Sequence, residues 1–211
     1  MKTILFTRGL ALYVCLIPLF SAGPVLAQAA APYGPAGERA VLRLRKMEWD
    51  GNSARIRTPE YRTSETRGLA RPKEWHCISV SYQTEPQWIA ELVFQYYVLA
   101  MKTEEGRNLY SLYRARVTYA DIAEGDHTST VFLRPSTIER FGSPVAAAVQ
   151  ILYQEKVVAE TNEARIRLPE KWWEDKRVVE KEGVTERDGR LLNRAQTPFA
   201  LVDVDAYEVI K

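Results

Sequence analysis

The sequence predicts an all-β protein, an immunoglobulin-like antiparallel β-sandwich with one or two short helical turns. Apolar and polar residues alternate with period two in many short segments, and Gly, Pro, Asp and Asn separate these segments. No long segment with helical periodicity lies between them. Strands connected in this way pack as antiparallel layers, and two stacked layers bury two strongly apolar strands most simply.

The most apolar of these segments, 88–102, is expected to be the central strand. Its even positions form an unbroken apolar row that should face the core: Trp88, Ala90, Leu92, Phe94, Tyr96, Val98 and Ala100. Its odd positions alternate less cleanly, so the second face should be partly covered or lie at a contact surface. A helix is the alternative, but it would spread the apolar side chains around its axis, and the aromatic and β-branched content favours a strand.

The remaining strands and turns follow from the same pattern. Further strands are expected at 41–49, 55–58, 74–82, 110–119, 128–133, 145–153, 157–160, 178–184, 191–194 and 199–210. Glu124-Gly125-Asp126 has the composition of a hairpin turn. Short helices are expected at 136–141, with a capping box from Ser136 to Glu139 and Gly142 as the C-terminal cap, and at 169–175.

The N-terminal residues have the features of a cleaved export signal. Lys2 and Arg8 precede the apolar run 10–20, and a cleavage point is expected after Ala27. The run is too short to cross a bilayer, so no membrane span is expected after cleavage. The expected organisation is a signal peptide at 1–27, a flexible Ala/Pro/Gly leader at 28–40 and one sandwich domain at 41–211.

Charge and cysteine content narrow the classes of function. The signal removes two of the 29 basic residues and none of the 27 acidic ones, so 27 of each sign remain. Nucleic-acid binding is not expected without a net positive field. Cys15 also leaves with the signal, which makes an intramolecular disulfide of Cys77 impossible.

The histidine, cysteine and carboxylate side chains that could take part in catalysis or bind a metal do not form a recognisable motif. His76 and Cys77 are neighbours in an expected strand, so their side chains point to opposite faces and cannot form a dyad. Cys77 is interpreted as a core residue and His127 as part of a solvated acidic hairpin tip. We therefore predict no catalytic residue, no metal site and no cofactor, although two distant carboxylates of a hydrolase would escape this test.

Aromatic residues and the second face of the central strand are the best candidates for partner binding. Trp172 and Trp173 lie in a charged segment that should be exposed, and we expect one ring to cap the sandwich and the other to contact a partner. The predicted binding residues are Glu91, Val93, Gln95, Tyr97, Trp172 and Trp173.

Several runs in the middle of the chain carry a family resemblance. EPQWIAELVFQYYVLAM, VTYADIAEGDHTSTVFLRP, ERFG and VQILYQEKVVAE lie between residues 75 and 160. This part resembles the small exported immunoglobulin-like proteins encoded in the pilus-like gene cluster of Akkermansia and related verrucomicrobial bacteria. The resemblance implies a two-sheet sandwich, an envelope or surface location and a non-enzymatic role in assembly or adhesion. It transfers no binding residue, because no site motif accompanies it.

The leading hypothesis is therefore an exported, periplasmic or cell-surface β-sandwich that is not an enzyme. It would bind other envelope or pilus-like proteins, or a second copy of itself, by apolar burial and strand-edge pairing. A carbohydrate-binding module is the first alternative and predicts coplanar exposed aromatic rings, with a glycan as ligand. A periplasmic hydrolase is the second and predicts a deep pocket that gathers acids or His127.

Overall fold

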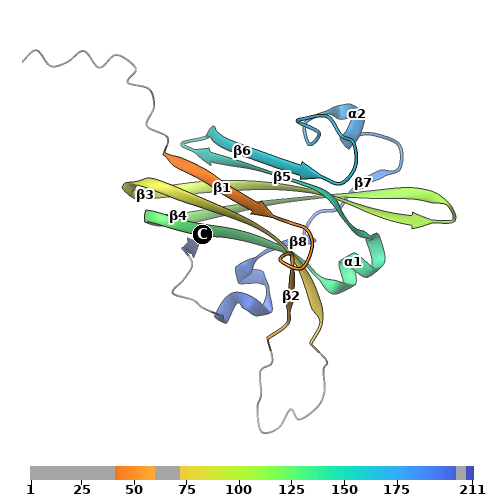
Figure 1. The fold of residues 1–211 in the computed structure, drawn as a ribbon, viewed down its shortest axis with the longest axis horizontal. Coiled ribbons are helices and arrows are strands. Elements are labelled where there is room, and N and C mark those ends of the chain that lie inside the picture. Colours follow the sequence, from red (N-terminus) through yellow and green to blue (C-terminus); the bar gives the residue numbers. More distant parts are fainter. Residues whose placement is uncertain (1–40, 60–71, 203–207) are drawn as a thin grey trace, which may run out of the picture. The chain divides into compact units, whose positions relative to one another are not determined.

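A computed structural model describes residues 41–59, 72–202 and 208–211, and strands dominate them (Figure 1). The expected signal peptide and leader lie outside these residues. The strands are β1 (Leu42–Glu48), β2 (Arg55–Arg57), β3 (Glu74–Glu104), β4 (Arg107–Leu133), β5 (Ser143–Tyr153), β6 (Lys156–Ala164), β7 (Val184–Glu186), β8 (Leu191–Asn193) and β9 (Val209–Ile210). Two short α-helices, α1 (Pro135–Phe141) and α2 (Lys176–Val179), accompany them. The predicted all-β sandwich with short helical turns is confirmed.

The long hairpin of β3 and β4 passes through both layers of the sandwich. Its tip is a two-residue turn in which Glu105 (φ 49°) and Gly106 (φ 75°) both have positive φ, the conformation of tight hairpin turns. Its pairing shifts between Thr84 and Trp88, and the Thr84 hydroxyl donates to the Ala123 carbonyl at 2.7 Å there. This irregularity bends both strands, so all nine strands belong to one sheet that folds back on itself.

The first layer consists of β1, β2, β8 and the halves of β3 and β4 at residues 74–84 and 125–133. The second layer consists of β5, β6, β7, β9 and the other halves, at residues 88–104 and 107–123. Among the described strands, all pairings are antiparallel except that of β4 with β7.

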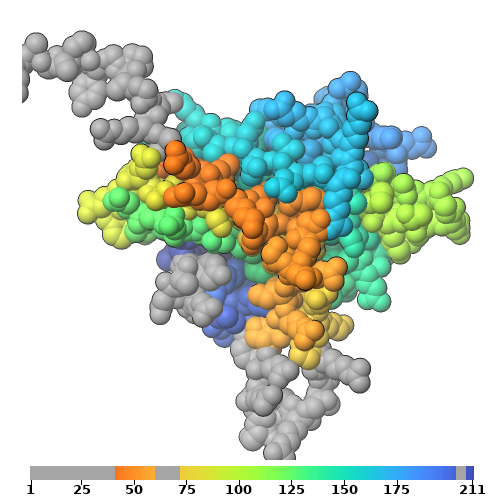
Figure 2. All heavy atoms as spheres, in the orientation of Figure 1, coloured from red at the N-terminus to blue at the C-terminus, as the bar shows by residue number. Residues whose placement is uncertain are grey.

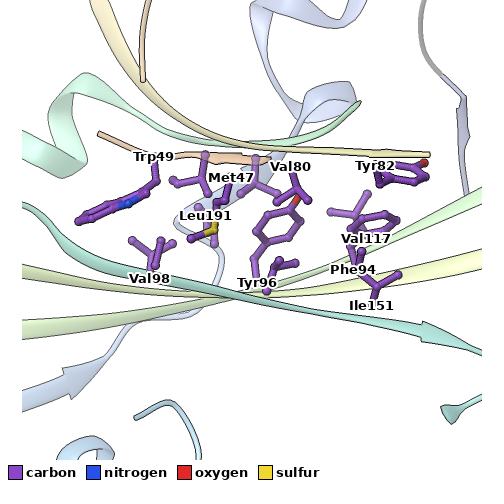
Figure 3. Close-up of a cluster of buried hydrophobic side chains, with 14 of the residues drawn as sticks. Met47, Trp49, Val80, Tyr82, Phe94, Tyr96, Val98, Val117, Ile151 and Leu191 are labelled. Carbon is purple, nitrogen blue, oxygen red and sulfur yellow. The ribbon is translucent and has the colours of Figure 1, made fainter. Parts of the chain in front are cut away.

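The main core lies between these layers. Figure 3 shows Met47, Trp49, Val80 and Tyr82 of the first layer opposite side chains of the second layer. The rings of Tyr82 and Phe94, one from each half of β3, lie 5.1 Å apart. The predicted inward row is confirmed for five side chains that are at most 2% exposed: Leu92, Phe94, Tyr96, Val98 and Ala100.

The bend explains where the sequence prediction of the long strands was wrong. Trp88 is 65% exposed and Ala90 is exposed, whereas Ile89 points into the core. The alternation changes phase near Asp121, which has a φ of 54° and lies between the paired residues Ala120 and Ile122. Residues 124–126 continue β4 through the bend and do not form a hairpin tip.

The helical predictions were partly correct. The helix α1 ends at Gly142 as expected, where the glycine amide donates to the Ile138 carbonyl at 2.8 Å. The predicted capping box is wrong, because Arg134 occupies the N-cap and Pro135 begins the helix. The helix expected at 169–175 is also wrong: this segment forms turns, and α2 begins only after Asp175, whose side chain accepts from the Arg177 amide at 2.9 Å.

The long closing strand predicted at 199–210 is not found. Residues Pro198–Leu201 form a 3₁₀ turn, η2, which follows the 3₁₀ turn η1 at Arg194–Gln196. The Thr197 hydroxyl caps η2 by accepting from the Phe199 amide at 3.2 Å, and the Phe199 ring stacks on Phe132 at 5.0 Å. Only Val209–Ile210 is a strand, β9, and residues 203–207 lie outside the described part.

Side chains at the end of β6 and directly after it contact the segment after β1 and connect the two layers at one side. The Trp49 indole N–H donates to Glu163 at 2.7 Å, and Arg165 forms an ion pair with Asp50 and lies over the Trp49 ring. Figure 2 shows β1, in orange, against the cyan surface of β6. The face of the second layer that points away from the main core, its outer face, carries the candidate functional residues.

Candidate functional site

The outer face of β3 presents the four predicted binding residues in one row. Across β4, Glu91 pairs with Ala120, Val93 with Thr118, Gln95 with Arg116 and Tyr97 with Arg114. Across β5, the partners of the last three are Leu152, Gln150 and Ala148. The structure therefore brings Glu91, Val93, Gln95 and Tyr97 together on the second face of the central strand, as period two requires.

One half of this face is covered by the chain itself. We call it the covered half; it is the apolar cluster of Leu99, Leu112, Val145, Ala146, Ala148, Trp172 and Trp173. Residues between Ile166 and Val184 pack against this cluster from outside the sheet. This half completes a second small core and offers no free surface over the tryptophans.

The expectation that one of the two adjacent tryptophans is exposed is wrong. Trp172 is 0% exposed and Trp173 is 3% exposed. Trp173 stacks on Tyr97, with ring centroids 6.1 Å apart, and Trp172 meets Trp173 edge-on at 5.9 Å. Both rings thus cover the sheet, because burying their large apolar area outweighs the charge of the flanking residues.

Tyr97 marks the boundary of the covered half. Its hydroxyl lies 3.1 Å from Oε1 of Gln95 and 3.3 Å from Oε1 of Gln150, and Nε2 of Gln150 donates to Glu174 at 2.8 Å. The Arg114 guanidinium lies 5.8 Å from the centre of the Tyr97 ring. Burial raises the pKa of Tyr97, and the positive charge of Arg114 opposes this effect. These contacts hold the boundary side chains in place.

The other half of the face is open, and we call it the open half. It contains two adjoining hollows that share Arg116. One hollow, of about 410 Å³, is lined by Ala90, Glu91, Val93, Arg116, Leu152, Tyr153, Gln154 and Glu155. The other, of about 270 Å³, is lined by Gln95, Tyr96, Tyr97, Arg114, Ala115 and Arg116.

Exposed apolar groups flank the open half on both sides. Val157 of β6 is 50% exposed and pairs with Leu152, which pairs with Val93. Val209 of β9 is 66% exposed and pairs with Ala120. Val93 and Ala120 themselves are buried, so the exposed apolar groups stand at the two sides of the open half, with polar and charged side chains between them.

The charges of the open half are only partly neutralised within the chain. Glu91 forms an ion pair with Lys211 at 2.7 Å, and Arg114 forms one with Glu186 at 3.2 Å. Arg116 and Glu155 are exposed, and within the described part of the chain neither has an ion-pair partner. Such a surface can bind a partner by apolar contact and by pairing of these two free charges.

Sequence reasoning missed the arginines of this face. Arg114 and Arg116 alternate with Tyr113, Ala115 and Val117 in a segment that was correctly predicted as a strand. The same period that placed the apolar side chains inside places both arginines outside, so the signal was present. The sequence alone does not give the pairing register of β3 with β4, which places Arg116 opposite Gln95.

The histidines and the cysteine occupy structural positions. His76 Nε2 lies 2.8 Å from the Trp49 carbonyl oxygen, and burial lowers the pKa of His76. Cys77 lies on the other face of β3, as predicted, in a cluster with Trp75 and Phe132, and burial raises its thiol pKa to about 11. These two neighbours do not form a catalytic dyad.

His127 is not at a solvated tip, contrary to the sequence interpretation. Its side chain is 11% exposed, and its Nδ1 contacts the Glu208 carboxylate. Its Nε2 lies 2.8 Å from the Ala123 carbonyl and 3.1 Å from the Thr84 hydroxyl. Both ring nitrogens are thus engaged at the bend, where they attach the segment before β9 to β4.

Metal-binding clusters and membrane-spanning helices are both absent from the described residues. No group of three or more His, Cys, Asp or Glu side chains is arranged to hold a metal ion within residues 41–59, 72–202 and 208–211. In these same ranges no helix has the length and apolar character needed to cross a membrane.

Comparisons with known proteins place the chain in a family. A crystal structure of a protein from Akkermansia muciniphila is similar, with a TM-score of 0.66 and 24% identity, over 81% of this chain and 92% of that one. None of the curated proteins searched matches. The resemblance to Akkermansia proteins is confirmed at the level of fold. A protein-family model matches residues 43–211, and the chain belongs to this family.

Proposed function

We propose that this protein is an exported, non-catalytic component of a bacterial envelope or surface assembly, and that it acts by binding protein through the open half. The open half carries this proposal: two hollows and two unneutralised charges lie on one face of the sheet, with exposed apolar groups at its two sides. Side chains on strands are held more firmly than those on loops, which lowers the entropy lost on binding.

The place of action is inferred from the sequence and from the family. The N-terminal residues have the pattern of an export signal, and the middle of the chain resembles exported proteins of a pilus-like gene cluster. The fold shared with an Akkermansia muciniphila protein supports the same assignment. We therefore propose a periplasmic or cell-surface location, and a role in assembly or adhesion beside pilus-like components.

The two alternatives receive less support from the described residues. A glycan platform needs exposed coplanar rings, but Trp172 and Trp173 are buried and their planes are perpendicular, at 90°. A hydrolase of the kind considered above needs a deep pocket that gathers acids or His127, but the His127 side chain is 11% exposed and its ring contacts one carboxylate, that of Glu208, in the described chain. Protein binding is the function that the surface fits best.

Site-specific photocrosslinking in cells tests this proposal. A benzoylphenylalanine at Gln95, within the open half, should give a covalent adduct with a defined protein of the envelope after irradiation. The same group at Arg107, at the exposed hairpin tip, is the matched control and should give no such adduct. Absence of any protein adduct from Gln95, together with binding to a defined glycan, would overturn the proposal.

A further inference from the structure

We infer that the partner of the open half is a second copy of this chain, bound face to face about a two-fold axis. This inference rests on the proposed function, because it names the partner of the same surface. In a two-fold interface the same patch serves both copies, so the patch must be complementary to itself. The distribution of charge and apolar area on the open half meets this condition.

The free charges of the open half are equal and opposite. Arg116 and Glu155 line the same hollow, both are exposed, and neither has an ion-pair partner in the described chain. Glu91, the remaining charged residue that lines this hollow, is paired with Lys211 at 2.7 Å. A partner with only acidic or only basic groups would leave one of the free charges without a counter-charge.

A two-fold axis that lies in the plane of the interface, midway between Arg116 and Glu155, gives each of these charges a counter-charge in the other copy. Arg116 of one copy would meet Glu155 of the other copy, and the reciprocal pair would form on the other side of the axis. Like charges would be kept apart by the same operation. The two contacts are equivalent, so each substitution at these positions acts twice in one dimer.

The apolar groups of the open half fit the same arrangement. Val157 and Val209, which are 50% and 66% exposed, lie at opposite sides of the face, on β6 and on β9. A face-to-face copy would cover both, together with the partly exposed Leu152 that pairs with Val157. Burial of these apolar side chains supplies the attraction, and the reciprocal ion pairs fix the orientation.

The net charge of the chain does not oppose association. If the N-terminal signal is removed as the sequence predicts, 27 basic and 27 acidic residues remain. Two copies then approach without a net electrostatic repulsion between them. The local pattern of the open half therefore decides whether they bind.

Charge-swap variants of the purified protein test the inference by sedimentation velocity across the micromolar range. The unaltered protein should show a concentration-dependent monomer–dimer equilibrium. Arg116→Glu and Glu155→Arg should each weaken dimerisation by about tenfold or more, because each places like charges together twice. The double variant, Arg116→Glu with Glu155→Arg, should recover most of the lost affinity.

The control is Arg107→Glu, which makes the same change of charge at the exposed tip of the β3–β4 hairpin and should leave dimerisation unchanged. Circular dichroism melting confirms that each variant is folded. A monomer at every concentration, single swaps without effect, a double swap without recovery, or an equal effect of Arg107→Glu would each overturn the inference. If the protein is monomeric but Gln95 still crosslinks to another envelope protein, the proposed function stands and the second copy does not.

Discussion

The covered and open halves of the second layer's outer face belong to the same strands, yet one is buried by the chain itself and the other is exposed. In the covered half, Trp172 and Trp173 seal Leu99 and Leu112 from water. In the open half, no described segment lies over Gln95 and Arg116, and the side chains line shallow hollows. The chain thus uses its own residues to protect one part of an amphipathic sheet face and leaves the other part accessible. Under the proposed function, a partner molecule would cover the open half as the two tryptophans cover the other half.

The largest effect is expected when the cover itself is removed. Trp172→Ala deletes a fully buried indole and should lower the free energy of unfolding by about 3–5 kcal/mol, because it leaves a cavity and exposes the covered half. Urea unfolding monitored by circular dichroism measures this.

The matched control is Trp88→Ala, which removes the same side chain from a position that is 65% exposed. Its free energy of unfolding should stay within about 0.5 kcal/mol of the unaltered protein. Equal losses in the two variants would show that Trp172 does not act as a cover.

A smaller loss is expected where α1 leads into the strand that carries both halves. Gly142 has a φ of 93°, and a Cβ at this position would lie 2.0 Å from the Met101 carbonyl oxygen. Gly142→Ala should therefore lower the free energy of unfolding by about 2 kcal/mol or more, since both the backbone and the contact are unfavourable.

Gly106→Ala is the comparison for this glycine. Gly106 also has a positive φ, of 75°, but a Cβ added at this position of the hairpin tip would have no described neighbour within 4 Å. Its loss should be only that of the strained backbone, about 1 kcal/mol. A Gly142→Ala variant as stable as the Gly106→Ala variant would contradict the close approach to Met101.

The buried tyrosines of the inner face of the same sheet should make the free energy of unfolding depend on pH in alkaline solution. Burial raises the pKa of Tyr119 from 10 to about 12, and it also raises the pKa values of Tyr82 and Tyr96. Above pH 10 the unfolded chain loses phenolic protons that the folded protein retains, so stability falls as the pH rises. Each such tyrosine should contribute a slope of about 1.4 kcal/mol per pH unit in this window.

Urea unfolding at several pH values between 10 and 12 measures this slope. Tyr119→Phe should reduce this slope by the contribution of one titrating tyrosine. The substitution also removes the acceptor of the hydrogen bond from the Ser129 hydroxyl, at 2.9 Å. The slope, and not the absolute stability, is therefore the test. An unchanged slope would mean that Tyr119 ionises at its ordinary pKa in the folded protein.

The smallest effect on stability is expected at Arg116. Because its side chain is exposed and has no ion-pair partner in the described chain, Arg116→Ala should change the free energy of unfolding by less than about 0.5 kcal/mol. Crosslinking from Gln95 should nevertheless fall in this variant. A large loss of stability would show that Arg116 supports the fold and is not available to a partner.

The fold could be predicted from sequence where a single strand decides the pattern. Period two placed Leu92, Phe94, Tyr96 and Val98 inside, and the same period placed Gln95 outside. It could not predict that Trp88 would be exposed, because a shift in pairing at the bend depends on two strands together.

The candidate site was predictable only in part, because it depends on which segments cover the sheet. Glu91, Val93, Gln95 and Tyr97 share a face as expected, but the charged residues around Trp172 suggested exposure where tertiary packing gives burial. In the C-terminal region, the Thr197-Pro198 cap turned the chain into η2 despite its alternating pattern. In the first segment a contact distant in sequence outweighed the local signal, and in the second a local cap outweighed the alternating pattern.

Hydroxyl-radical footprinting of the protein in its native assembly, compared with the purified monomeric fraction, tests the central claim most directly. Assembly should protect the side chains at the flanks of the open half, Val157 and Val209, from oxidation. Leu109, which is 42% exposed at the β3–β4 hairpin, should react equally in both samples. Protection of Leu109 with continued oxidation of Val157 and Val209 would contradict the account.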